Sequence, residues 1–100
     1  MAITNPLVNS YKRLRVYQSL SGSSWAPAYL AQGPNNRSAA LRTLHGRFEW
    51  RVPDASANPY LASAALIAAG LDGIDRELEL PAGVDDDLFA LSLPQVLERG

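Results

Sequence analysis

The sequence predicts an α+β fold in which antiparallel strands are followed by a buried helix. Short segments of alternating character fill the first half, and glycine-, proline- and asparagine-containing turns separate them. Residues 59–69 are instead almost entirely apolar and follow an asparagine, a pattern typical of a helix. The length of 100 residues fits one domain or a piece of one.

Four strands are expected in the first half. They cover residues 8–16, 28–32, 38–44 and 47–52. Serines and a glycine in residues 17–24 predict a mobile loop that Trp25 closes as a lid or anchor, while residues 33–36 and 45–46 predict turns. Because short turns join neighbouring strands, we expect an antiparallel meander.

The helix predicted over residues 59–69 has clear end signals. Asn58 is a suitable N-cap, Pro59 suits the first helical position, and Gly70 is expected to terminate the helix. Ser63 is its only polar interior residue, so the helix should be buried on several sides. A chain of this length offers little structure of its own for that burial.

The tail carries weaker signals. Residues 71–74 are expected to turn the chain and residues 75–81 to form a polar connector. The three aspartates at 85–87 resemble a metal-binding triplet, but the favoured interpretation is the acidic first turn of a helix that continues through residues 88–91. Ser92 resembles the cap of a further helix.

The net charge of -1 conceals two unequal halves. Residues 1–51 carry one lysine, six arginines and a single acid, Glu49, whereas residues 52–100 carry nine acids and two arginines. Arginine in this excess favours planar, bidentate recognition of carboxylate or phosphate. Nucleic acid is a disfavoured phosphate source, because the basic residues are scattered over separate strands and no standard reader motif is present.

Alternation along residues 47–52 places charged side chains on one face of a strand and apolar side chains on the other. The charged face holds Arg47, Glu49 and Arg51, and the apolar face holds Phe48, Trp50 and Val52. This charged row is an anion site with a carboxylate inside it. The alternative is a solvated edge strand whose charges pair with one another.

Two further arginines can join this row under one condition. Arg37 and Arg42 are five residues apart, so they would face opposite ways in a regular strand. They can share a site only if Arg37 lies in the turn before the strand begins.

Several classes of protein are excluded or disfavoured by composition. The chain has no cysteine, which excludes disulfides and thiolate chemistry and is compatible with a reducing cytoplasm, the location we expect. No apolar run approaches the roughly 20 residues needed to span a bilayer, so no membrane association is expected. The first six residues lack the features of a secretory signal.

Five blocks of sequence, in order, resemble the glutamine synthetase catalytic domain. They are Asn9-Ser10-Tyr11-Lys12-Arg13-Leu14, Asn36-Arg37-Ser38-Ala39, Arg47-Phe48-Glu49-Trp50-Arg51, Pro53-Asp54 with Ala57-Asn58-Pro59-Tyr60-Leu61, and Ala69-Gly70-Leu71-Asp72-Gly73-Ile74. The resemblance is clear over residues 3–75 and loose over 76–100. It corresponds to the C-terminal part of a domain several times this length, so residues 1–100 are expected to be a partial catalytic domain.

The resemblance implies an ATP-dependent ligase that phosphorylates the side-chain carboxylate of glutamate and lets an amine displace the phosphate. It implies Mg²⁺ or Mn²⁺ as cofactor, ATP as co-substrate and Glu49 as one metal ligand. The roles it implies for the arginines are substrate binding for Arg13, Arg37 and Arg51, catalysis for Arg37 and Arg42, and nucleotide binding for Arg42 and Arg47.

One difference from typical members of the family bears on which amine is the substrate. Typical members of the family carry Gly-Tyr-Glu-Ala-Pro on a flap, whereas this chain has Trp25-Ala26-Pro27 after a longer loop. That form is more similar to the type III-like branch, which includes glutamate–methylamine ligases, so ammonia and methylamine both stay open. His45 does not fall at the metal-binding histidine's block and is expected to be an exposed turn residue.

The resemblance also implies partners. The blocks that precede this region in the family are absent, so the chain is expected to be inactive alone and to act with the missing N-terminal portion or as a homo-oligomer. Two alternatives are a non-catalytic remnant that binds ATP or glutamate, and a structural partner that docks on a ligase subunit through the helix at residues 59–69.

Overall fold

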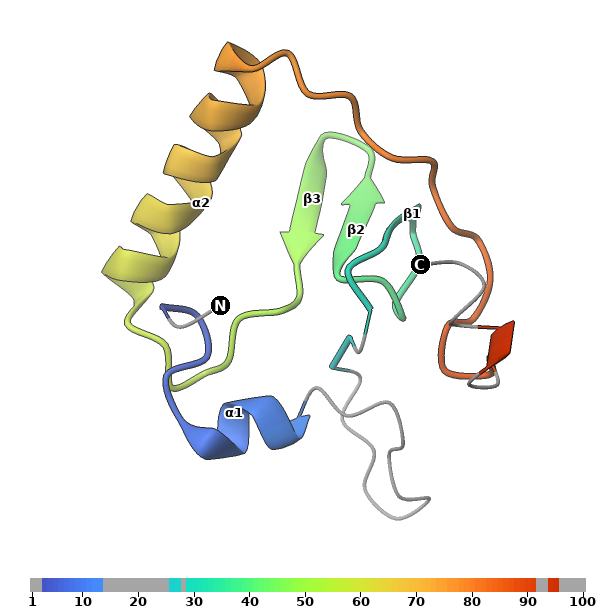
Figure 1. The fold of residues 1–100 in the computed structure, drawn as a ribbon, viewed down its shortest axis with the longest axis horizontal. Helices are drawn as coiled ribbons and strands as arrows, with labels where there is room; N and C mark the ends of the chain where they lie inside the picture. Colours follow the sequence, from blue (N-terminus) through green and yellow to red (C-terminus); the bar gives the residue numbers. More distant parts are fainter. Residues whose placement is uncertain (1–2, 14–25, 28, 92–93, 96–100) are drawn as a thin grey trace.

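The computed structural model describes residues 3–13, 26–27, 29–91 and 94–95. The elements along the chain are α1 (Val8–Arg13), β1 (Gln32–Pro34), β2 (Leu41–Leu44), β3 (Arg47–Trp50) and α2 (Pro59–Asp75). Figure 1 shows the sheet in the middle, with α2 on one side and the tail after α2 arching over to the other. The predicted α+β fold class is confirmed.

The three strands form one sheet in the order β1-β2-β3. The hairpin of β2 and β3 is antiparallel, pairs Leu41 with Trp50 and Leu44 with Arg47, and turns at Gly46, whose φ is +74°. β1 and β2 are parallel, so the predicted all-antiparallel meander is wrong at this pair. The chain loops back between them before β2 begins, because the Asn36 carboxamide turns the backbone by accepting from the Ser38 N–H at 2.8 Å.

The strand boundaries also differ from the sequence prediction. β1 covers residues 32–34 rather than 28–32, so it contains a glycine and a proline that were predicted as turn. β2 begins at Leu41 rather than at residue 38, because residues 38–40 belong to the loop from β1. β3 covers residues 47–50 of the predicted 47–52, although the Arg51 N–H still donates to the Ala40 carbonyl at 2.9 Å.

Residues 8–13 form a helix, so the strand predicted over residues 8–16 is wrong where the structure describes it. Ser10 explains the difference. Its buried hydroxyl accepts from the Leu7 N–H at 3.3 Å, and its own N–H donates to the Leu7 carbonyl at 3.0 Å. These bonds close the first turn of α1 and satisfy a donor that a helix start leaves open. Residues 14–25, with the predicted loop and Trp25, lie outside the described residues.

The start of α2 is confirmed and its predicted end is wrong. Asn58 caps the helix by accepting from the Tyr60 and Leu61 N–H groups at 3.0 and 3.3 Å. The helix continues through Gly70 and the predicted turn at residues 71–74 as far as Asp75. A Schellman motif closes its C-terminus, because the φ of +50° at Glu77 lets the Leu78 N–H reach the Gly73 carbonyl at 2.9 Å.

The core of the described residues is small. Its buried apolar residues are Ala26, Ala39, Ala40, Val52 and Leu88. No described residue of α2 is buried, so the expected burial of this helix is not met by the chain itself. Large apolar side chains on α2 are instead exposed, including Leu61, Ile67, Leu71 and Ile74. Within the described residues, no helix is both long enough and apolar enough to cross a membrane.

The tail packs along β1 after the connector. The Val84 N–H donates to the Gln32 carbonyl at 2.9 Å, and Leu88 is buried. Residues 85–87 do not begin a helix, so that interpretation is wrong. Asp87 instead accepts from the Phe89 N–H at 3.0 Å and holds a turn, because its short carboxylate competes for the backbone N–H. Residues 92–93 and 96–100, where a helix was predicted after Ser92, lie outside the described part of the chain.

Candidate functional site

The charged row on β3 meets a second arginine from β2. Arg42 stands opposite Glu49 in the hairpin register, and its guanidinium nitrogen lies 3.0 Å from the Glu49 carboxylate. Arg47 lies on the other side of the same carboxylate at 3.6 Å. The structure therefore brings Arg47 and Glu49 together as the strand alternation predicts. It adds Arg42 through cross-strand pairing, which alternation within one strand cannot reveal.

Arg42 is the most enclosed charge of this cluster, with 14% of its side chain exposed. Nη1 donates to both Glu49 oxygens, at 3.0 and 3.3 Å, and Nη2 donates to the Asn35 carboxamide oxygen. Its Nε is buried and has no hydrogen-bond partner among the described residues.

The Glu49 carboxylate stays ionised at neutral pH. The hydrogen bond from Arg42 is the main reason that its pKa lies below the ordinary value of 4.5, and the charges of Arg42, Arg47 and Arg51 act in the same direction against partial burial. The side chain is 36% exposed, so one edge of the carboxylate remains open to solvent. It is a hard, anionic oxygen ligand of the kind that Mg²⁺ and Mn²⁺ accept.

Arg51 lies in the same positive field. Burial lowers the pKa of its guanidinium, Glu49 raises it, and the charges of Arg42 and Arg37 lower it further. One Arg51 nitrogen donates to the Ala39 carbonyl at 3.5 Å. The charges of Glu49, Arg42 and Arg37 therefore all act on the Arg51 guanidinium.

A cavity of about 430 Å³ opens where the turn after β1 meets β2 and the tail. It is lined by Pro34, Asn35, Asn36, Arg37, Ser38, Arg42, Asp85 and Asp87. Arg37 lies in the turn before β2, so the condition for Arg37 and Arg42 to share a site is met. The two arginines suit a ligand with carboxylate or phosphate oxygens, whereas Asp85 and Asp87 on the opposite part of the lining oppose an anion beside them.

Asp85 and Asp87 are lining residues that sequence reasoning missed. They reach the cavity because the tail returns to β1 about fifty residues along the chain, and no local pattern reports such a contact. Asn35 and Asn36 were predicted only as turn residues, although their amides also bond Arg42 and the tail. Their polar side chains between Pro34 and Arg37 were the available signal.

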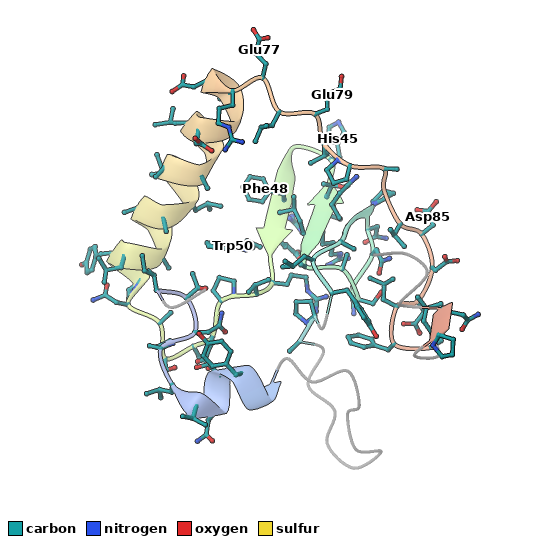
Figure 2. The ribbon with its side chains drawn as sticks, viewed as in Figure 1. His45, Phe48, Trp50, Glu77, Glu79 and Asp85 are labelled. Carbon is teal, nitrogen blue, oxygen red and sulfur yellow. The ribbon has the colours of Figure 1, made fainter. Side chains whose placement is uncertain are left out.

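The sequence also singled out Arg13, His45 and the three aspartates at residues 85–87. The side chain of Arg13 lies outside the described residues, so its predicted role stays a prediction. His45 is exposed in the β2–β3 turn, as expected, and Figure 2 shows it at the tip of the hairpin. The metal triplet at residues 85–87 has no support, since no group of three or more possible metal-ligating side chains occurs within the described residues.

A second, apolar groove of about 340 Å³ lies between the sheet and α2. Trp50 from β3, Leu41 from β2 and Leu66 and Ala69 from α2 contribute to its lining. Figure 2 shows Phe48 and Trp50 on the side of β3 that faces α2. The groove joins the exposed apolar residues of α2, and we refer to both together as the α2 face.

Comparison with known proteins adds three findings. The family described as "Glutamine synthetase, catalytic domain" matches residues 1–98. The chain is 54% identical over 99 residues to the glutamate–methylamine ligase of Methyloversatilis universalis, and the match covers 99% of this chain and 22% of that protein. It is 46% identical over 90 residues to the glutamine synthetase of Rhizobium leguminosarum, covering 89% of this chain and 21% of that protein.

A solved structure of a GmaS/ADP complex has the same fold as this chain. The TM-score is 0.76 at 45% sequence identity, and the match covers 89% of this chain and 21% of that one. The chain therefore spans about a fifth of the length of the relatives it matches.

Proposed function

The chain belongs to the glutamine synthetase family, and we propose that it forms part of an ATP-dependent ligase that joins an amine to the side-chain carboxylate of glutamate. The observation that carries the proposal is the cluster around Glu49. The residues that the family resemblance assigns to metal, phosphate and nucleotide come from a turn and two strands. In this structure Arg42 and Arg47 contact Glu49, and Arg37 shares the cavity of Arg42.

The proposed reaction has two steps. The side-chain carboxylate of glutamate attacks the γ-phosphorus of ATP, and ADP leaves. The amine then attacks the carbon of the acyl phosphate, and phosphate leaves with the electrons of the broken carbon–oxygen bond. Each step moves negative charge onto phosphate oxygens, and fixed guanidinium groups stabilise that charge without competing as metal ligands.

The arginines divide this work by position. Arg37 and Arg42 line the polar cavity, where we place the transferred phosphoryl group. Arg47 is 69% exposed and extends outward, which suits contact with the nucleotide. Arg51, together with Arg13, would bind the glutamate carboxylate.

Glu49 would hold one divalent cation, Mg²⁺ or Mn²⁺, and that cation supplies positive charge to the phosphates when bound. The low pKa of Glu49 keeps the ligand ionised. One carboxylate does not make a magnesium site. Because no group of three candidate ligands occurs within the described residues, the remaining ligands must come from other parts of the assembled protein.

The amine is methylamine or ammonia. The glutamate–methylamine ligase is 54% identical to this chain, against 46% and 50% for the glutamine synthetases of R. leguminosarum and Halobacterium salinarum, and this order favours methylamine. The difference is small, and the two amines differ by one methyl group, which a pocket distinguishes by only about 1–3 kcal/mol. The assay below therefore compares both.

We further propose that the rest of the catalytic domain covers the α2 face. A 17-residue helix with no buried residue is unusual beside an apolar groove, and relatives are about five times longer than this chain. The surplus of exposed leucine and isoleucine is the expected appearance of a domain from which the covering portion is absent. Activity would then require that portion, or further subunits, as a partner.

A non-catalytic function is the second candidate. The arginine cavity needs no metal to bind ATP or glutamate, whereas turnover needs ligands that the described residues do not supply. A remnant of this kind would bind nucleotide and release no phosphate.

The experiment uses a hybrid ligase, in which this chain replaces the matching 99 residues of the M. universalis enzyme. Phosphate release from ATP is measured with glutamate, Mg²⁺ and either amine. We expect release that depends on the amine, is faster with methylamine, and is lost in Glu49→Gln but kept in Glu79→Gln, an exposed glutamate of the connector (Figure 2). Nucleotide binding without phosphate release would favour the non-catalytic candidate.

A further inference from the structure

The side chain of Asn36 makes every hydrogen bond that a carboxamide can make. Its oxygen accepts from the Ser38 N–H at 2.8 Å and from the Ser38 hydroxyl at 2.6 Å. Its nitrogen donates to the Val84 carbonyl at 2.7 Å and to the Asp86 carbonyl at 2.9 Å. Two acceptor and two donor positions are the full capacity of the group, so no other polar residue of this size can replace it.

The two halves of this carboxamide act on different segments. The oxygen closes a turn from Asn36 to Ser38 and so encloses the backbone of Arg37. The nitrogen ties that turn to residues 84–86 of the tail, about fifty positions further along the chain. Asn36 therefore links the turn of the arginine that lines the polar cavity to the tail that forms the cavity's other wall.

Further contacts hold the tail against the same turn. The buried Ser38 hydroxyl accepts from the Leu88 N–H at 3.0 Å, and the Gln32 side chain donates to the Pro81 carbonyl at 2.7 Å. Gly33 lies so close to the tail that a Cβ there would be 2.2 Å from the Val84 carbonyl oxygen. Residues 81–88, which we call the tail strap, are thus fixed against β1 and the turn by backbone contacts.

We propose that Asn36 is a positioning residue for the ligase, which holds Arg37 in the polar cavity by anchoring its turn to the tail strap. The proposal rests on the proposed function, in which Arg37 contacts a phosphoryl or carboxylate group. Asn36 also lines the cavity, but the hydrogen-bonding positions of its carboxamide are taken by backbone groups and by Ser38. Its effect on the reaction passes through Arg37.

The Asn36→Asp substitution separates the two halves of the carboxamide. An aspartate keeps an oxygen that accepts from Ser38, but it directs a second oxygen at the carbonyls of Val84 and Asp86, which repel it. The turn stays closed and the anchor to the tail strap is lost. Asn58→Asp is the matched control, because Asn58 is exposed at the start of α2 and aspartate is an equally good N-cap.

The first test is a double-mutant cycle in the hybrid ligase, with phosphate release as readout. We expect Asn36→Asp to lower kcat/KM about tenfold or more, Arg37→Lys to lower it as well, and the double variant to be no slower than Arg37→Lys alone. A merely structural defect would reduce the amount of folded enzyme independently of residue 37. Effects that multiply in the double variant would therefore overturn the proposal, as would an Asn36→Asp enzyme no slower than Asn58→Asp.

The second test needs no activity. Amide hydrogen exchange is measured by mass spectrometry on the hybrid and on the 100-residue chain, in peptides that cover residues 35–40 and 84–90. Asn36→Asp should speed exchange in both peptides by about tenfold, because the strap and the turn lose their link, while Asn58→Asp leaves both unchanged. Unchanged exchange in the 84–90 peptide would overturn the proposal. A hybrid that lacks ligase activity while this coupling is present would count against the proposed function alone.

Discussion

Replacing Gly33 with alanine tests whether the tail strap packs against β1 as closely as the structure indicates. The new Cβ would lie 2.2 Å from the Val84 carbonyl oxygen and 2.9 Å from the Asn36 Cβ. A carbon and a carbonyl oxygen normally approach no closer than about 3.3 Å, so the strap has to move away by roughly 1 Å. Both nearest atoms belong to fixed groups, so no flexible side chain can relieve the contact.

The movement lengthens two hydrogen bonds beyond their useful range. The Val84 N–H bond to the Gln32 carbonyl is 2.9 Å, and the Asn36 bond to the Val84 carbonyl is 2.7 Å. Adding about 1 Å to each exceeds the 3.2 Å upper limit of an N–H···O bond. At about 1 kcal/mol for each bond, Gly33→Ala should lower the free energy of unfolding by about 2 kcal/mol.

Urea denaturation of the 100-residue chain measures this change, and Gly70→Ala is the control. Gly70 lies inside α2 with no atom within 4 Å of the added Cβ, so the same chemical change should raise the free energy of unfolding by about 0.5–1 kcal/mol there. The two substitutions should thus have opposite signs. A Gly33→Ala chain as stable as the original would refute the close packing of the strap.

Three further predictions concern the site, the helix cap and the α2 face. The hydrogen bond from Arg42 lowers the pKa of Glu49, so the stabilisation of the fold by this carboxylate is complete above pH 4.5 and is lost as the pH falls through the lower pKa of the folded chain. An NMR titration should show that the titration midpoint of Glu49 rises in Arg42→Gln. An unmoved midpoint would contradict the pairing of Glu49 with Arg42. Asn58→Ala should lower the free energy of unfolding in urea by about 1 kcal/mol, because the Tyr60 and Leu61 N–H groups lose their acceptor. Asn58→Asp should leave the free energy of unfolding unchanged. Equal destabilisation by both substitutions would argue against capping by Asn58. Leu66→Asp should abolish co-purification of the chain with an M. universalis ligase from which the matching 99 residues have been removed. Ser63→Asp is the control and should leave co-purification intact, because Ser63 lies on the same helix but does not line the groove. Binding that Leu66→Asp does not affect would exclude the α2 face as the contact.

Local chemistry made part of this structure predictable. The charged and apolar faces of residues 47–52, the turn at His45 and Gly46, and the Asn58 cap each depend on neighbouring residues alone, and each is present. Whether Arg37 can share a site with Arg42 also depended on local sequence. The two asparagines before Arg37 predict a turn, and the last residue of a turn can face either side of the following strand.

Contacts between distant residues account for what the sequence did not reveal. Asn36 bonds to the tail 48 and 50 residues away, and the position of Asp85 in the lining of the arginine cavity follows from the tail's return to β1. Alternation in residues 8–13 was misleading, because a few exposed residues fit a period of two as well as a helix, and the buried Ser10 decided between them.

The end of α2 illustrates a different limit. Gly70 and Gly73 are good helix terminators only where another conformation offers better hydrogen bonds. No such competing contact occurs at Gly70, so the helix runs on until Glu77 adopts a positive φ and the Leu78 N–H bonds back to Gly73. The exposed apolar surface on that longer helix is the observation behind the proposal that another part of the catalytic domain covers the α2 face.

We propose above that this chain contributes to a ligase that activates glutamate by phosphorylating its side-chain carboxylate. The most direct measurement supplies the hybrid ligase with ATP, Mg²⁺, methylamine and glutamate labelled with ¹⁸O in that carboxylate, and analyses the released phosphate by mass spectrometry. Phosphate that carries one ¹⁸O atom is the predicted result, since the bridging oxygen of the acyl phosphate leaves with the phosphorus. Release of unlabelled phosphate alone would mean that water attacks ATP directly, and would contradict the account.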